Sequence, residues 1–238
     1  MNKQVAVTGA GGGIGQAIVD NLAGHGLSVW GLDVAAPPAG KEGVRWLSVD
    51  VTEPASVHGA VKAIYGSTEG PVDLVCCAGI VEDDVPAEEM PIDIFDKIIS
   101  VNLRGLFLCC QAFGRELLAR GGGSIVNIAS MSGNYVVNHP QHQCAYNSSK
   151  AAVTALTKSL AVEWGPRGVR LNAVSPGYIK TPLVAAKAHQ FHHWMPGIVA
   201  GRFGEPAEVA QAVAFLLSTG ANYCYGTELL MDGGFSLR

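Results

Sequence analysis

The sequence has few charged residues and no long apolar run. Asp, Glu, Lys and Arg make up only 15% of its 238 residues, the formal net charge is −4, and no basic cluster occurs. Because nucleic-acid-binding proteins need a basic surface, nucleic acid is not an expected partner. No stretch reaches the roughly 18 apolar residues that would span a bilayer, so we expect no membrane partner either. A strand pattern begins a few residues after Met1, which leaves no room for a cleavable signal.

The chain also lacks any C-x-x-C pair, although it contains six cysteines. Four of them form the adjacent pairs Cys76–Cys77 and Cys109–Cys110 in apolar segments, and Cys144 and Cys224 stand alone. This distribution predicts free thiols in a reducing cytosol, and therefore a cytoplasmic protein without a disulfide framework. A catalytic thiol at Cys144, two residues before Tyr146, is the less favoured alternative.

A metal site is not expected. His189 and His193 are four residues apart and could hold zinc on a helix, with His192 between them, but no acidic or cysteine partner is near in sequence. A lid or a subunit contact is the favoured interpretation of this segment. His139 and His142 precede Tyr146, and they either line a substrate pocket or lie in solvent.

Short apolar runs alternate with longer helical patterns along the whole chain, without repeats or linkers. The expected strands are Gln4–Thr8, Ser28–Asp33, Val44–Ser48, Leu74–Cys77, Ser124–Ile128, Arg170–Val174 and Glu228–Met231. One helix is expected directly after the first strand and its glycine-rich turn. The other expected helices are Pro54–Tyr65, Ile92–Leu118, Ala145–Trp164 and Pro206–Leu217. This order predicts a single α/β domain over residues 1–238, with a parallel, doubly wound, seven-stranded Rossmann sheet. Residues 181–202 break the pattern and are the expected substrate lid.

A glycine-rich turn lies between the first strand and the first helix. Gly9, Gly13 and Gly15 follow Thr8, and Ile14 begins the apolar face of the helix. Such a turn lets the backbone approach a pyrophosphate at the helix N-terminus. Asp33 ends the next strand, 18 residues after Gly15, where a carboxylate can accept hydrogen bonds from a ribose. No Arg or Lys lies between Thr8 and Asp33 to pair with a 2′-phosphate, which favours NAD over NADP.

Tyr146 and Lys150 are four residues apart, which places them on one face of a helix. A tyrosine has a pKa of about 10, and a nearby ammonium would lower that pKa and make the phenol a better base. Ser130 could hold the same substrate oxygen. Alone, such a Tyr–Lys pair is usually a solvated surface pair, and the glycine turn and Asp33 favour the catalytic interpretation.

Taken together, these motifs resemble the short-chain dehydrogenase/reductase family over nearly the whole chain. Thr8–Gly9 through Gly15 resembles its cofactor turn, and Asn102 resembles the asparagine that completes a catalytic tetrad with Ser130, Tyr146 and Lys150. The remaining matching positions are Asp50, Val51, Ala78, Gly79, Pro176, Gly177, Ile179 and Thr181 for the cofactor, and Asp232–Gly234 near the C-terminus.

The resemblance implies a role for each member of the tetrad. Tyr146 would be the acid/base, and Lys150 would bind the nicotinamide ribose and depress the Tyr146 pKa. Ser130 would orient the substrate oxygen, and Asn102 would hold a water that links Lys150 to solvent. The family also implies a homotetramer, with one contact through the helices at 92–118 and 145–164 and another through 206–217 and the last strand. Low charge and abundant apolar residues (48%) agree with an oligomer.

The chain departs from the family in two places. Cys76–Cys77 stands where the family usually has Asn-Asn. Because a thiol is a weak hydrogen-bonding group, the brace of the central sheet could be lost, but we expect the pocket to survive because Ala78 and Gly79 are retained. Only ten residues separate Asp33 from Val44, too few for the usual helix, so we expect a loop and a more open adenine side.

The segment between Ser130 and Tyr146 resembles the polyol branch of the family, which includes galactitol, arabinitol and sorbitol dehydrogenases. Its polar residues are Ser132, Asn134, Asn138, Gln141 and Gln143. They could pair with a chain of hydroxyls, with Ser130, Ser132, Asn138 and Tyr146 as the expected substrate residues, or they could be ordinary loop residues.

The expected function is therefore NAD-dependent interconversion of a secondary alcohol and a ketone, with a polyol or ketose as substrate. A 3-oxoacyl thioester or steroid reductase of the same fold is an alternative. A non-enzymatic dinucleotide sensor is another, but a sensor would have no need of all four tetrad residues.

Overall fold

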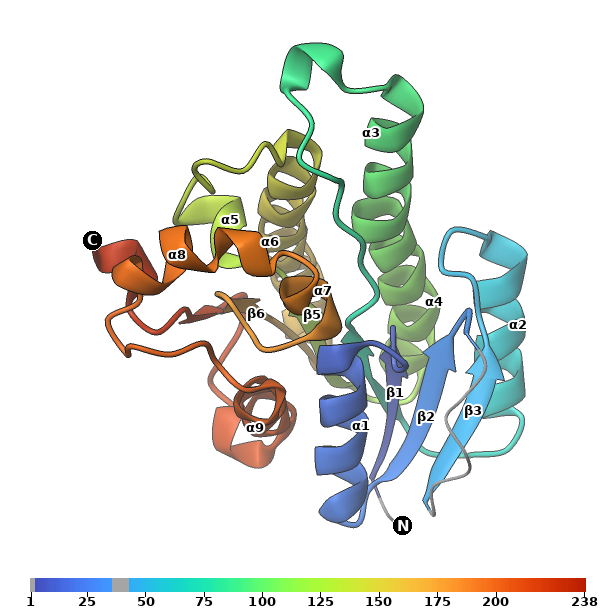
Figure 1. Cartoon of the computed structure of the whole chain (residues 1–238). Helices are drawn as coiled ribbons and strands as arrows, with labels where there is room; N and C mark the ends of the chain where they lie inside the picture. Colours follow the sequence, from blue (N-terminus) through green and yellow to red (C-terminus); the bar gives the residue numbers. More distant parts are fainter. Residues whose placement is uncertain (1–2, 36–42) are drawn as a thin grey trace.

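Seven strands, each a short apolar run, pair in parallel in the spatial order β3-β2-β1-β4-β5-β6-β7 (Figure 1). The computed structural model describes residues 3–35 and 43–238. The strands are β1 Gln4–Thr8, β2 Ser28–Asp33, β3 Val44–Ser48, β4 Val72–Cys76, β5 Gly123–Ile128, β6 Val169–Pro176 and β7 Glu228–Met231. The predicted α/β class with a parallel, seven-stranded Rossmann sheet is confirmed.

Helices cover both faces of this sheet (Figure 1). The longer ones are α1 Gly13–Gly24, α2 Pro54–Tyr65, α3 Ile92–Ile99, α4 Leu106–Ala119, α6 Cys144–Trp164 and α9 Pro206–Leu217. The short ones are α5 Met131–Asn134, α7 Pro182–Ala185 and α8 Phe191–Trp194. No helix in the described part of the chain is both long and apolar enough to cross a membrane.

Alternate residues of the strands enter two separate cores. Ala6 and Leu74 pack with α2, α4 and α6 on one face, whereas Val5 and Val75 pack with α1 and α9 on the other. Because both faces are covered, the central strands β1, β4, β5 and β6 are buried at nearly every position.

The helix predicted over Ile92–Leu118 is wrong as a single element. The backbone changes to a π-helical turn at Ser100–Gly105, between α3 and α4. A π turn widens the helix by one residue and rotates the helical segment after it, so it can aim one side chain that a regular helix would direct elsewhere. Asn102 lies in this turn and is fully buried.

The bounds of three strands also differ from the prediction, and β5 differs only in that it begins at Gly123. β4 begins at Val72 and ends at Cys76, so Cys77 lies outside the strand. β6 runs on to Pro176, because β7 pairs with it up to the register of Pro176 with Met231. The loop expected between Asp33 and Val44 falls largely on residues 36–42, which lie outside the described residues.

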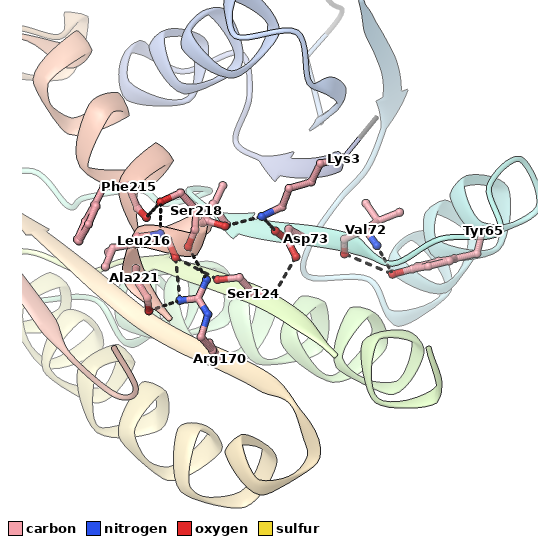
Figure 2. A network of polar contacts seen from close by, with 12 residues as sticks. Lys3, Tyr65, Val72, Asp73, Ser124, Arg170, Phe215, Leu216, Ser218 and Ala221 are labelled. Carbon is pink, nitrogen blue, oxygen red and sulfur yellow. Dashed lines mark hydrogen bonds and ion pairs between the residues drawn. The ribbon is translucent and has the colours of Figure 1, made fainter. Parts of the chain in front are cut away.

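A buried polar network joins the amino-terminal ends of the strands to the end of α9 (Figure 2). Lys3 forms an ion pair with Asp73 at 2.7 Å, and the Asp73 carboxylate accepts a hydrogen bond from Ser124 N. Arg170 donates to three backbone carbonyls, those of Leu216, Ser218 and Ala221. The network therefore lies at the amino-terminal ends of the strands, opposite to their carboxyl ends.

Candidate active site

The glycine turn after β1 is shaped by close backbone contacts. Gly9 has a φ of 65°, and a Cβ on Gly15 would lie 2.0 Å from the Gly9 carbonyl oxygen. Gly12 precedes α1 and has no side chain to cap the first turn, which leaves backbone N–H groups of that turn available to an anion. Side chains at these positions would fill the turn. Because glycines occupy them, the backbone can come close to a dinucleotide pyrophosphate.

Asp33 lies beside this turn at the end of β2. Its Oδ2 accepts a hydrogen bond from Gly11 N at 2.9 Å, and its Oδ1 accepts one from Ala35 N at 3.0 Å. Each oxygen retains a second lone pair, so the carboxylate can still accept from ribose hydroxyls.

The predicted nicotinamide-side segment begins against the same turn. A Cβ on Gly13 would lie 2.9 Å from the Thr181 methyl carbon, and Thr181 Oγ1 caps α7 by accepting from Val184 N. Pro176 is the last residue of β6, and Gly177 donates to Met231. Ile179 is buried, and it bridges to Gly204 across the end of the sheet.

The other predicted cofactor residues lie along the carboxyl ends of β3 and β4. Asp50 Oδ1 accepts from the Thr52 hydroxyl and backbone N–H, and these bonds hold the Asp50 pKa below its usual range. The Val51 side chain is buried in the core. Ala78 donates to the Thr8 hydroxyl, and a Cβ on Gly79 would lie 3.4 Å from both Lys150 Nζ and Asn102 Oδ1.

Helix α6 carries Tyr146 and Lys150, as the sequence predicts. The Lys150 ammonium lies 5.7 Å from the centroid of the Tyr146 ring and donates to the Ile128 carbonyl at 2.8 Å. The Lys150 side chain is buried, and burial lowers its pKa to about 8. Ser130 follows β5 and caps α5, accepting from Ser132 N and donating to the Ser132 hydroxyl.

The lowering of the Tyr146 pKa by Lys150 stays a prediction, because other groups set this pKa in the protein without cofactor. Burial is the largest influence and raises the pKa of Tyr146, and the carboxylate of Glu82 raises it further. The Ser130 hydroxyl is the group that lowers it. Lys150 lies over the Tyr146 ring, and its ammonium donates to the Ile128 carbonyl.

Asn102 connects the chain after β4 to helix α6. Its Oδ1 accepts from Ile80 N at 2.8 Å, and its Nδ2 donates to the Ile80 carbonyl and to the Ser149 hydroxyl. Both amide hydrogens are therefore used, and a bound water would have to donate to an oxygen of this residue. The water-holding role of Asn102 stays a prediction.

Known proteins resemble this chain along its entire length. A family model described as enoyl-(acyl carrier protein) reductase matches residues 9–236. Galactitol 2-dehydrogenase (L-tagatose-forming) of Cereibacter sphaeroides is 38% identical over 98% of this chain and 94% of its own. The NAD-dependent glycerol dehydrogenase of Listeria innocua is 36% identical over 100% of this chain and 95% of its own. The cyclohexanol dehydrogenase of an Acinetobacter species is 36% identical over 100% of this chain and 96% of its own.

A solved structure agrees with these matches. A short-chain type dehydrogenase/reductase from Mycobacterium marinum superposes with a TM-score of 0.93 at 36% identity, covering 100% of this chain and 97% of that one. The chain belongs to the short-chain dehydrogenase/reductase family. As a member of it, the protein is an oxidoreductase that binds a nicotinamide dinucleotide and acts on CH–OH groups.

For a short-chain dehydrogenase, the thiols at Cys76 and Cys77 are unusual, and they do not leave the sheet unbraced. Cys76 Sγ lies 3.9 Å from Cys110 Sγ of α4, and Cys110 Sγ contacts Asn127 Oδ1 at 3.6 Å. Asn127 in turn donates to the Thr157 hydroxyl of α6. The brace is therefore retained in a weaker form, because these contacts still join β4 and β5 to α4 and α6. Burial raises the pKa of Cys77 to about 12, which keeps it a neutral thiol.

The polar residues between Ser130 and Tyr146 divide into two groups. Asn134 is exposed and bonds to Glu228, away from the tetrad. Ser132, Asn138, Gln141 and Gln143 are buried. Asn138 donates to the Tyr178 hydroxyl at 3.3 Å, but its Oδ1 and Gln141 Oε1 have no hydrogen-bond partner within residues 3–35 and 43–238.

Aromatic residues hold the segment 181–202 onto the body of the protein. Tyr178 stacks on Trp194 with ring centroids 4.3 Å apart, and Phe203 and Phe235 meet Tyr178 edge-on. Met131, next to Ser130, packs in the same cluster. The predicted lid is thus anchored beside the candidate catalytic serine.

The histidines take no part in this cluster. His189, His192 and His193 are exposed, and the described residues contain no group of three His, Cys, Asp or Glu side chains that could hold a metal ion. His142 is exposed and its ring lies 2.8 Å from Asp84 Oδ1. His139 is also exposed.

One residue of the site escaped prediction from the sequence. Glu82 is only 3% exposed, and its carboxylate accepts hydrogen bonds from Ala145 N and Tyr146 N. The sequence shows only an acidic residue three positions after Gly79. Because the hydrogen-bond partners of Glu82 lie more than 60 residues further along the chain, no local pattern indicates its role.

Proposed function

We propose that this protein is an NAD-dependent dehydrogenase that interconverts a secondary alcohol of a polyol and the ketone of a ketose. The observation that carries the proposal is that Ser130 and Lys150 both lie against Tyr146, with the Lys150 ammonium also beside Gly79. The relatives named for galactitol and glycerol support the substrate class.

In this proposal each side chain has one task. Bound NAD supplies the acceptor for the hydride that leaves the carbinol carbon. Tyr146 Oη takes the proton of the substrate hydroxyl, and Ser130 Oγ holds the same oxygen in place. Lys150 supplies a cation at Gly79 for the nicotinamide ribose hydroxyls. Asn102 fixes the chain at Ile80 against α6, and so keeps the wall of this pocket in position.

Buried but unpartnered oxygens support a hydroxyl-rich substrate. Asn138 Oδ1 and Gln141 Oε1 would each accept a hydrogen bond from a substrate hydroxyl, and a buried acceptor without a partner costs about 1–3 kcal/mol. A polyol supplies such donors, whereas a simple secondary alcohol does not.

A panel of polyols, ketoses, cyclohexanol and acetoacetyl thioester tests the substrate class by the absorbance of the reduced nicotinamide. We expect polyols to give the highest kcat/KM. Asn138→Ala and Gln141→Ala should raise KM for polyols about tenfold, by roughly 1.4 kcal/mol each, and leave KM for cyclohexanol unchanged. Asn134→Ala is the matched control, because Asn134 is exposed.

Two results would replace the proposal. The relative named for cyclohexanol favours a second candidate, a dehydrogenase of simple cyclic alcohols, which would respond to the variants equally with all substrates. Faster reaction with the thioester than with any polyol would instead indicate an acyl thioester reductase.

The preference for NAD rests on Asp33. Its carboxylate lies at the glycine turn, and a 2′-phosphate there would face a like charge without a cation. We expect wild type to bind NAD more tightly than NADP. Asp33→Ala combined with Val34→Arg should reverse this preference, since Val34 is 67% exposed and can present a cation. Equal affinity of wild type for both dinucleotides, measured by titration, would refute the assignment.

The proposed location is the cytoplasm. All six cysteines are free thiols, which agrees with a reducing compartment.

A further inference from the structure

Helix α6 carries both Tyr146 and Lys150, yet its first turn lacks a cap of its own. Gln143 precedes the helix, and its side chain makes no capping hydrogen bond among the described contacts. The first bond of the helix runs from Asn147 N to the Gln143 carbonyl at 2.9 Å. The N–H groups of Ala145 and Tyr146 therefore need an acceptor from elsewhere in the chain.

Glu82 supplies that acceptor from the segment that follows β4. Its Oε1 accepts from Ala145 N at 3.0 Å and from Tyr146 N at 3.1 Å, and Oε2 lies 3.2 Å from Tyr146 N. Glu82 is 3% exposed, so these charge-assisted bonds are shielded from water. A negative charge at this end also interacts favourably with the helix dipole.

The neighbours of Glu82 fix its segment on two sides. Asp84 Oδ1 accepts from the backbone N–H of His142 at 2.6 Å and lies 2.8 Å from its ring. Lys187 of the lid segment donates to the Glu82 carbonyl oxygen at 3.3 Å. The carboxylate is thus held between the chain that leads into α6 and the lid.

We propose that Glu82 is a positioning residue for Tyr146, because it accepts the two backbone N–H groups that fix the first turn of α6. This inference rests on the proposed function, in which Tyr146 transfers the proton. Tyr146 is the third residue of the helix, so a first turn that frays would move its ring relative to Ser130.

The carboxylate also acts on Tyr146 through its charge. The groups that face the Tyr146 phenol are Glu82, the Ser130 hydroxyl, the Cys77 thiol and the Lys150 ammonium. Burial raises the Tyr146 pKa most, Ser130 lowers it, and Glu82 and Cys77 raise it. Because Gln keeps an oxygen acceptor but removes the charge, Glu82→Gln should lower the Tyr146 pKa.

Two substitutions at Glu82 separate geometry from charge, and Asp83→Asn is the matched control, because Asp83 is the exposed carboxylate next to it. Asp is one methylene too short to reach both N–H groups, so Glu82→Asp should lower kcat about 10- to 100-fold with the pH profile unmoved. Glu82→Gln should keep most of its plateau kcat, while the acid limb of its pH profile for alcohol oxidation moves to lower pH. Asp83→Asn should match wild type in both.

The Tyr146 titration is also read without turnover, as the phenolate absorbance that Tyr146→Phe removes. A Glu82→Asp enzyme with full kcat would overturn the proposal, and so would a Tyr146 titration in Glu82→Gln at the wild-type pH. If wild type oxidises no alcohol in the panel, the proposed function fails, and the absorbance titration still decides whether Glu82 governs Tyr146.

Discussion

At the scale of single residues, Tyr146 is subject to opposing influences. Burial and the Glu82 carboxylate favour the neutral phenol, whereas Ser130 favours the phenolate. Because the Tyr146 pKa is raised, the phenolate fraction increases with pH across the neutral and alkaline range. We therefore expect the rate of alcohol oxidation to increase as pH rises, and the rate of ketone reduction, which needs the protonated phenol, to stay constant until the pH approaches the raised pKa of Tyr146.

Replacing Tyr146 by Phe should remove nearly all turnover and leave cofactor affinity close to wild type. The ring and its packing remain, and only the hydroxyl that transfers the proton is lost, which typically costs 10²–10⁴-fold in rate. Steady-state kcat and dinucleotide titration measure the two effects. Lys150→Ala is the comparison variant, and it should impair both, since its ammonium lies beside Gly79 as well as over the Tyr146 ring. More than about a tenth of the wild-type rate in Tyr146→Phe would contradict the acid/base role.

Residue-level prediction from sequence succeeded where a motif is local. Tyr146 and Lys150 lie one helical turn apart, and Asp33 follows an apolar strand, so their types and spacing carry the information. Glu82 was missed because its hydrogen-bond partners lie 63 and 64 residues away. The effect of burial on the Tyr146 pKa was missed because burial depends on the packed structure.

At the scale of elements, the helix predicted over Ile92–Leu118 shows what apolar periodicity can miss. The sequence Ser100–Gly105 contains no proline, and its periodicity continues smoothly from α3 into α4, so nothing local marks the π turn. The turn is stabilised by the residues it meets in space, because Asn102 bonds to Ile80 and Ser149. A local irregularity with distant partners is a feature that a single sequence cannot specify.

The strands were more predictable than the helix boundaries. They are the apolar runs that a covered parallel sheet requires, and the order of strands and helices fixes their topology. The extension of β6 to Pro176 was missed because Ser-Pro normally indicates a turn. Pairing with β7 overrides that preference.

At the scale of the whole molecule, the buried polar network and the candidate catalytic residues lie at opposite ends of the strands. The network of Lys3, Asp73 and Arg170 lies where the strands begin (Figure 2), and the tetrad lies where they end. Substitutions in the network should therefore affect unfolding without affecting catalysis.

Arg170→Met tests this separation. It removes three hydrogen bonds from a charged donor to backbone carbonyls, each of which keeps a second donor, at about 1 kcal/mol each, so the free energy of unfolding should fall by about 3 kcal/mol. For a chain of this size the Tm should fall by roughly 6–12 °C, with kcat at 25 °C unchanged. Burial raises the pKa of Asp73, and Arg170 attracts only its ionised form, so the loss should be smaller at acid pH, where Asp73 is protonated.

Circular dichroism melting curves and kcat measure both quantities. Arg167→Met is the matched control, since Arg167 is exposed in the same region. A large fall in kcat at a temperature where Arg170→Met remains folded would contradict the separation between the two ends of the strands.

We also predict a homotetramer, because apolar side chains are exposed on the helices that flank the sheet. Phe107 of α4 and Val162 of α6 are 37% and 78% exposed, and Phe215 of α9 is 48% exposed. Light scattering at micromolar concentration should give four times the chain mass, and Val162→Lys should reduce it. A monomer for wild type would refute the prediction.

The contact between Gly13 and Thr181 has a consequence for the order of events in time. The first residue of the lid lies against the turn expected to receive the pyrophosphate, with only 2.9 Å between a Cβ on Gly13 and the Thr181 methyl carbon. If residues 181–202 act as the predicted lid, we expect the dinucleotide to bind before they close over the alcohol and to leave after the ketone. Such an ordered cycle would make NADH a competitive inhibitor toward NAD and a noncompetitive one toward the alcohol, and the departure of NADH would set the pace of steady turnover.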